Sequence, residues 1–396
     1  MFIAGSTLSG LGSTLVQFAI TWHIVLLTES GFMLMLSTVF GFLPQLLISL
    51  PAGAWADRFN KKTLIILADA SLVVTAGVLA VLFMAGHDYI WLLFVISVVR
   101  SAGIGVRGPA VLSIIPNIVP AEHLARVNGI RASLRGITGL VAPALAGGLY
   151  ATIGIHALFI GDVVSGGMGI LLLFFITISW RKTPESPGMW ESMVGGVKYI
   201  FITPWLKLFF IIFIATTLMI GPAAFLSPLL IVRNFGDEPF FLAAHGMSMS
   251  TGSIAGGFVT GWIAGKFANK IRLTMVMFLL WGLVIFSLGF AGVFWLFIGI
   301  AALLGATVSL MNAAIITALQ TYTDPNYIGR VFSFTWLVDG AAIPISMMIF
   351  GPIADIVPVE WLIIISGGAI AVISLLGVRL NAWKSFDRQA DTHEKT

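Results

Sequence analysis

The feature that most constrains this chain is a succession of long apolar stretches separated by short polar breaks. A helix needs about 20 apolar residues to cross the hydrocarbon core of a bilayer. About twelve such stretches follow one another along the 396 residues, at 2–27, 32–54, 63–85, 90–112, 132–154, 157–179, 206–230, 241–263, 273–292, 294–318, 331–354 and 361–382. The pattern predicts an all-α integral membrane protein with twelve transmembrane helices.

The composition agrees with a chain whose main solvent is lipid. Hydrophobic residues make up 58% of the chain and charged residues only 10%, with a mean hydropathy of +1.03. Soluble domains carry roughly 25% charged residues. The basic residues flank apolar stretches and form no continuous stripe, which argues against nucleic acid as a partner. The absence of cysteine excludes disulfides and cysteine-based metal or redox chemistry.

The distribution of lysine and arginine predicts the orientation in the membrane. If the loop at 55–62 is cytoplasmic, alternate breaks and the tail join it on that side. Together these segments hold about 17 of the 21 basic residues, as the positive-inside rule requires. Both termini are therefore expected in the cytoplasm.

The longest polar break divides six predicted spans from six. We expect an N-terminal half at 1–180, a cytoplasmic linker with an amphipathic helix at 181–205, a C-terminal half at 206–383 and a short cytoplasmic tail at 384–396. The halves also echo each other. "GAWADRFNKK" at 53–62 aligns with "GWIAGKFANK" at 261–270, as expected for parallel repeats.

The loop at 53–62 resembles the signature G-x-L-a-D-R-x-G-R-K of the major facilitator superfamily of transporters. Asn60 replaces the second glycine, and we expect it to tolerate a left-handed turn there. Segments such as "VPAEHLARVNGIR" and "DPNYIGRVFSF" resemble sequences of the macrolide and multidrug efflux branch of this superfamily. The resemblance implies two six-helix halves and a gate at this loop. The implied gate residues are Gly53, Asp57, Arg58, Lys61 and Lys62, of which the lysines are expected to serve mainly the topology.

Two further motifs follow from the same resemblance. A weaker copy of the gate motif is implied at Gly261, Gly265 and Lys266, and a glycine–proline motif of the fifth span at Gly139, Pro143, Gly147 and Gly148. The run Gly257, Gly261, Gly265 is expected to let span 8 approach a neighbouring helix closely.

Ionisable residues inside the spans are the candidates for chemistry, because a charge at mid-bilayer costs at least ~2.5–3.5 kcal/mol. Arg100 either faces a cavity or forms a structural ion pair with a neighbouring helix. Asp339 is the preferred proton site, with a partnership to the gate loop as its alternative, whereas Asp69 and Asp162 are expected to be structural. Gln17 either lines the cavity or joins helices.

These features together predict a secondary transporter of a bacterial cytoplasmic membrane rather than an enzyme. Neither a nucleotide-binding P-loop nor a G-x-S-x-G motif occurs, so an ATP-driven pump or a hydrolase finds no support. We expect a monomer that exports amphipathic, drug-like or macrolide-like compounds, with the proton as coupling ion and no cofactor or metal. The alternatives are an exporter or flippase of an endogenous lipid or siderophore and, with less support, a non-transporting membrane scaffold.

Overall fold

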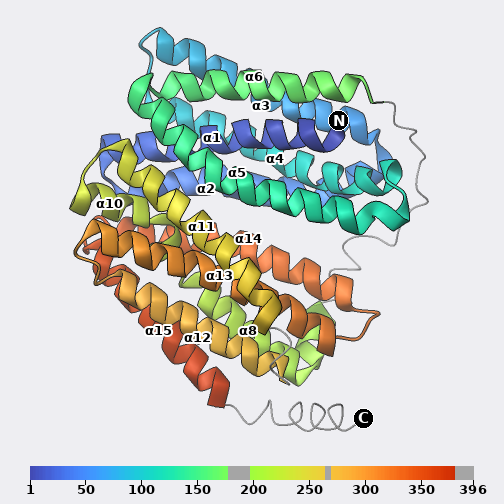
Figure 1. Cartoon of the computed structure of the whole chain (residues 1–396), viewed down its shortest axis with the longest axis vertical. Coiled ribbons are helices and arrows are strands. Elements are labelled where there is room, and N and C mark those ends of the chain that lie inside the picture. Colours follow the sequence, from blue (N-terminus) through green and yellow to red (C-terminus); the bar gives the residue numbers. More distant parts are fainter. Residues whose placement is uncertain (177–196, 264–268, 380–396) are drawn as a thin grey trace. The chain divides into compact units, whose positions relative to one another are not determined.

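A computed structural model describes residues 1–176, 197–263 and 269–379 of the chain (Figure 1). Within these ranges the regular structure is helical and contains no strand. Among the residues that the structure describes, eleven segments are long and apolar enough to cross a membrane. A further helix of 25 residues, α11 (Pro239–Ile263), also has the length of a span. The predicted all-α, multi-spanning fold is thereby confirmed.

The chain divides into two compact units that do not follow the sequence strictly. Unit 1 contains 1–186 together with 231–247, and unit 2 contains 187–230 together with 248–396. The chain thus enters unit 1 a second time for 17 residues. Much of the predicted linker and the whole predicted tail lie outside the described residues, so the expected half boundaries stay a prediction.

Unit 1 is built on six long helices. They are α1 (Phe2–Thr28), α2 (Gly31–Arg58), α3 (Lys61–Met84), α4 (Ile90–Ile118), α5 (Leu124–Thr152) and α6 (Ile155–Phe174). The most extensive packing joins α1 to α6, α2 to α4, and α3 to both α4 and α6. Helix α5 begins eight residues before the predicted span, because the arginine-containing turns at its start continue the helix beyond the apolar stretch.

Unit 2 holds the remaining spans. They are α8 (Pro204–Leu218), α9 (Gly221–Phe225), the start of α10 (Ser227–Phe235), the later part of α11, α12 (Lys270–Leu288), α13 (Phe294–Tyr322), α14 (Ile328–Ile353) and α15 (Val359–Arg379). Helix α12 packs against α13 and α15, and α14 packs against α8 and α9. Three consecutive elements, α8 to α10, occupy the place of the single predicted span 206–230.

Two asparagines in the repeated motif start equivalent helices. The Asn60 side chain accepts a hydrogen bond from the backbone N–H of Lys62 and caps α3. The Asn269 side chain accepts from Ile271 and Arg272 and caps α12. Asn60 has a φ of −64°, so the left-handed conformation that asparagine tolerates is not adopted here. Asparagine is suitable here because its short side chain satisfies the free N–H groups of a helix start.

Candidate functional site

Asp69 and Arg107 form an ion pair inside unit 1. Arg107 Nε lies 2.6 Å from Asp69 Oδ1, and the Ser9 hydroxyl donates to the same oxygen at 2.9 Å. Arg107 also donates to the backbone carbonyl of Ser6 at 2.9 Å. Asp69 is only 1% exposed. The pair and its two serine contacts therefore tie α1, α3 and α4 together.

Arg100 and Asp162 form a second ion pair, between α4 and α6. Arg100 Nη1 lies 2.8 Å from Asp162 Oδ2 and donates to the carbonyl of Leu72 at 3.0 Å. Both side chains are almost fully buried, at 5% and 1% exposure. Arg100 Nη2 has no hydrogen-bond partner among the described residues. Arg100 therefore forms an ion pair between α4 and α6; whether it also has a role in coupling stays a prediction.

Close packing of α1 against α6 encloses this second pair. A Cβ built at Gly12 would lie 2.6 Å from Asp162 Oδ1 and would also overlap the Ser165 hydroxyl. Glycine is therefore required for α1 to pass so close to the carboxylate. The two pairs contain two positive and two negative groups, so their net charge is formally zero. A buried set of charges has to be close to neutral, because an uncompensated buried charge is costly.

Asp339 is situated differently from the other two acids. It lies near the middle of α14, and its side chain is exposed. It forms no ion pair with any residue in the described ranges. Lipid offers no partner to a carboxyl at that depth of a membrane helix, so we expect Asp339 to face water or a ligand.

The gate motif is resolved in part. Gly53 lies in the last turns of α2 and has open space where a Cβ would be. The side chains of Asp57 and Arg58 lie outside the described part of the chain, as do Gly265 and Lys266 of the repeated motif; Gly261 is in the last turn of α11. The expected contacts of these residues are therefore untested.

The two lysines of the motif bind helix ends within unit 1. Lys61 is 8% exposed and donates to the carbonyl of Ser113 in α4 at 3.1 Å. Lys62 donates to the carbonyls of Phe174 and Ile176, at 3.3 and 2.9 Å, where α6 ends. A cation at a helix C-terminus is stabilised by the helix dipole. Their positions add a structural role to the topological one considered from the sequence.

Residues 243–246 pack against the glycine–proline motif of α5. The sequence had not predicted this contact. Pro143 lies against Gly246, where a Cβ would approach the proline ring at 2.8 Å. Gly147 lies against Ala243 of the same segment. Gly148 has open space beside it, and Gly139 lies two helical turns before Gly147. The motif therefore forms a flat surface on α5 for residues 243–246, which belong to unit 1.

Gln17 lies between α1 and α2. A Cβ at Gly41 of α2 would come within 3.5 Å of its amide nitrogen, and the amide also approaches the Thr21 hydroxyl at 3.5 Å. These contacts accord with the helix-joining alternative for Gln17.

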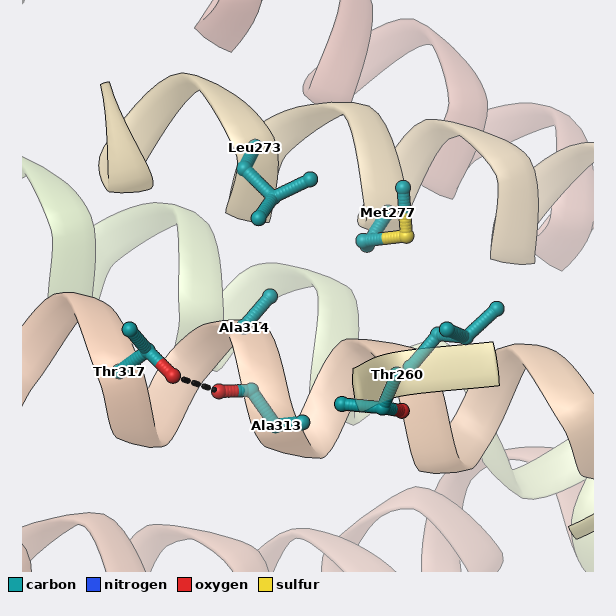
Figure 2. Close-up of a pocket in the computed structure, with 7 residues that line it drawn as sticks. Thr260, Leu273, Met277, Ala313, Ala314 and Thr317 are labelled. Carbon is teal, nitrogen blue, oxygen red and sulfur yellow. Dashed lines mark hydrogen bonds between the residues drawn. The ribbon is translucent and has the colours of Figure 1, made fainter. Parts of the chain in front are cut away.

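A small pocket in unit 2 lies between α11, α12 and α13 (Figure 2). It is lined by Thr260, Leu273, Met277, Leu310, Ala313, Ala314 and Thr317. The Thr317 hydroxyl donates to the carbonyl of Ala313, and that of Thr260 to the carbonyl of Gly256. With both hydroxyls satisfied, the walls are apolar. The free space is about that of one water molecule, so the pocket is a packing gap and is too small for an amphipathic substrate.

Comparisons with known proteins agree with this architecture. Residues 2–347 match the family model described as "Major Facilitator Superfamily". Macrolide efflux protein A of Streptococcus pyogenes is 25% identical over 97% of this chain and 96% of its own length. The multidrug efflux pump Tap of Mycobacterium tuberculosis is 22% identical over 87% of this chain and 84% of its own length.

Solved structures show the same fold at low identity. A bacterial homolog of the human lysosomal transporter Spinster, in an inward-facing and unoccupied conformation, aligns with a TM-score of 0.64 and 16% identity, covering 100% of this chain and 96% of its own. The nucleoside transporter NupG aligns with a TM-score of 0.71 and 13% identity, covering 94% and 98%. The family match covers most of the sequence and the fold agrees, so this multi-pass membrane protein belongs to the Major Facilitator Superfamily of transporters.

Proposed function

We propose that the protein is a proton-coupled exporter of amphipathic small molecules that works by alternating access. Export of such compounds is supported by the efflux proteins that it resembles along nearly its whole length. In this mechanism two six-helix halves expose a central site to one side of the membrane at a time. The bilayer and the small-molecule substrate are the only partners that the mechanism requires.

The observation that carries the proposal of proton coupling is the contrast among the three acidic side chains deep in the described spans. Asp69 and Asp162 are buried and paired with arginines, whereas Asp339 is exposed and unpaired. A coupling acid has to gain and lose a proton during the cycle, so it needs access to water and freedom from a permanent cation. We therefore assign the proton to Asp339.

Arg100 is the weaker candidate for coupling. Its guanidinium is held by Asp162 and by the carbonyl of Leu72, and protonation of Asp162 would leave that cation buried without compensation. We propose that both ion pairs keep the N-terminal half rigid. Alternating access requires such rigidity, because each half moves as one body.

Different elements would close the two sides. The gate motif around Asp57, with its weaker copy near Gly261, is proposed to lock the cytoplasmic side. The surface of α5 formed by Pro143 and Gly147, with residues 243–246 packed on it, is proposed to seal the opposite side. Small residues at this contact let the two segments separate without disentangling side chains.

The test is proton release in everted membrane vesicles that carry a preformed pH gradient. Macrolides, lipophilic cations, siderophores and lysolipids are added one at a time to vesicles with wild-type protein, with Asp339→Asn, or without the protein. We expect one class to collapse the gradient with the wild type only. Because the amide cannot bind a proton, Asp339→Asn should reduce that response by about tenfold or more.

The loop variant Asp237→Asn serves as the matched control, because Asp237 is an exposed acid between α10 and α11. A response limited to lysolipids or siderophores would favour export of an endogenous compound instead. A wild-type response that persists in Asp339→Asn would refute the assignment of the proton to Asp339.

A further inference from the structure

Span 7 is interrupted near its middle, at a point where a membrane helix has to satisfy its backbone groups internally. Helix α8 ends at Leu218 and α9 begins at Gly221, within a membrane-length segment of 32 residues. Pro222 has no N–H, so the carbonyl of Leu218 lacks the donor that an uninterrupted helix would supply four residues later. An unsatisfied backbone group is costly at this depth because no water replaces the lost bond.

One side chain of α14 satisfies both sides of the break. The Ser346 hydroxyl donates to the carbonyl of Leu218 at 2.6 Å and accepts from the N–H of Gly221 at 3.1 Å. Ser346 is fully buried. A Cβ at Gly221 would lie 2.8 Å from the Cβ of Ser346, so only glycine admits α14 this closely. The remaining described serines of α14 and α15 bond carbonyls of their own helices instead.

The chain beyond the break leads into the segment that packs on α5. It passes from unit 2 to unit 1 after Leu230, nine residues beyond Gly221, and returns after Met247. The segment 231–247 carries Ala243 and Gly246, which contact α5 within unit 1. A bend at the break would therefore let this segment stay on α5, or leave it, without displacing α8.

We propose that the break at 218–221 is a hinge of the transport cycle and that Ser346 is the positioning residue that holds it. The hinge role rests on the alternating-access function proposed above, whereas the Ser346 bridge does not. Ser346 lies seven residues, about two helical turns, after Asp339 on the same side of α14. A change at Asp339 that moves α14 would thus act directly on the hinge.

Amide hydrogen exchange on the full chain in nanodiscs tests the bridge. Ser346→Ala should accelerate exchange over residues 218–226 by about tenfold or more, because the hydrogen bond of Gly221 is lost. The matched control is Ser374→Ala, a buried serine that bonds only Ile370 of its own helix, and it should leave residues 218–226 unchanged. Unchanged exchange in Ser346→Ala would overturn the bridge.

A compensating variant separates the bridge from general damage to folding. Pro222→Ala restores an N–H that can donate to Leu218, so Pro222→Ala/Ser346→Ala should exchange more slowly than Ser346→Ala alone. Equal exchange in both would mean that Ser346 acts through packing, and the assignment of its hydrogen bonds would fail.

The hinge is tested by alkylation of the variant Ala243→Cys in the same nanodiscs. Ala243 is buried and faces Gly147, and the chain has no other cysteine, so a maleimide reports separation of segment 231–247 from α5. In this background Ser346→Ala should speed alkylation and Pro222→Ala should slow it, each by about threefold or more. Altered exchange with unaltered alkylation would overturn the hinge and leave the bridge. Neither measurement needs a substrate or a pH gradient, so a failed vesicle assay would not be mistaken for failure here.

Discussion

At the scale of single residues, the contact of Gly12 with Asp162 gives the clearest stability prediction. Gly12→Ala places a methyl group against the carboxylate and Ser165, and overpacking of this kind costs about 1–3 kcal/mol. The thermal midpoint in detergent should fall. Gly10→Ala is the matched control, since no atom lies within 4 Å of a Cβ there. Equal midpoints for the two variants would contradict the packing of α1 on α6.

The buried pair itself predicts a pattern of non-additivity. Asp162→Asn leaves Arg100 as an uncompensated buried charge, and breaking such a pair costs about 3–5 kcal/mol. Arg100→Gln/Asp162→Asn removes both charges and should be more stable than either single variant. Thermal unfolding of the four proteins forms a double-mutant cycle. Additive losses would mean that the two groups do not interact in the membrane-embedded protein.

The sequence predicted which residues are charged inside the spans but not which of them pair. Arg100, Asp69 and Asp162 stand out because charges are rare in apolar stretches. Their partners depend on the faces that α3, α4 and α6 turn to one another, and no residue spacing within one helix specifies this. Arg107, which is the partner of Asp69, was not among the candidates predicted from the sequence.

At the scale of elements, the contact between α11 and α13 shows the same limit. The glycine run was expected to act through Gly257, yet that position has open space around it. The residues that do approach α13 closely are Gly252 and Gly256 of α11. A Cβ at these positions would overlap Ala302 and Ala306, respectively. Glycines spaced four residues apart form a stripe of small side chains along one face of a helix. A stripe shifted by one residue lies on a different face, so the spacing alone does not predict which stripe contacts the neighbouring helix.

This contact makes a prediction with a control one residue away. Gly256→Ala should lower the thermal midpoint and the yield of folded protein, because its methyl group would overlap the backbone of Ala306. Gly257→Ala should be tolerated. Fluorescence-detected size exclusion after heating would measure both. Greater damage from Gly257→Ala would show that the two faces of α11 are assigned in reverse.

At the scale of the whole molecule, the multi-spanning helical fold could be predicted because length and apolarity identify most segments that can cross a membrane. The interruption of span 7 could not, because Gly221 and Pro222 are also compatible with a continuous, kinked helix. The deciding group is Ser346, more than a hundred residues later in the chain. The second entry of the chain into unit 1 is likewise a tertiary property that hydropathy does not encode.

The orientation of the whole chain in the membrane is a prediction from the distribution of charge, and it gives the last test. About 17 of the 21 basic residues lie in segments assigned to the cytoplasm. Because the chain has no cysteine, Asp237→Cys and Ser385→Cys each provide a single reporter. On intact cells an impermeant maleimide should label Asp237→Cys, in the outer loop. It should label Ser385→Cys, in the tail, only after the cells are permeabilised. The opposite pattern would invert the topology, place the gate motif outside, and make the proposed direction of export untenable.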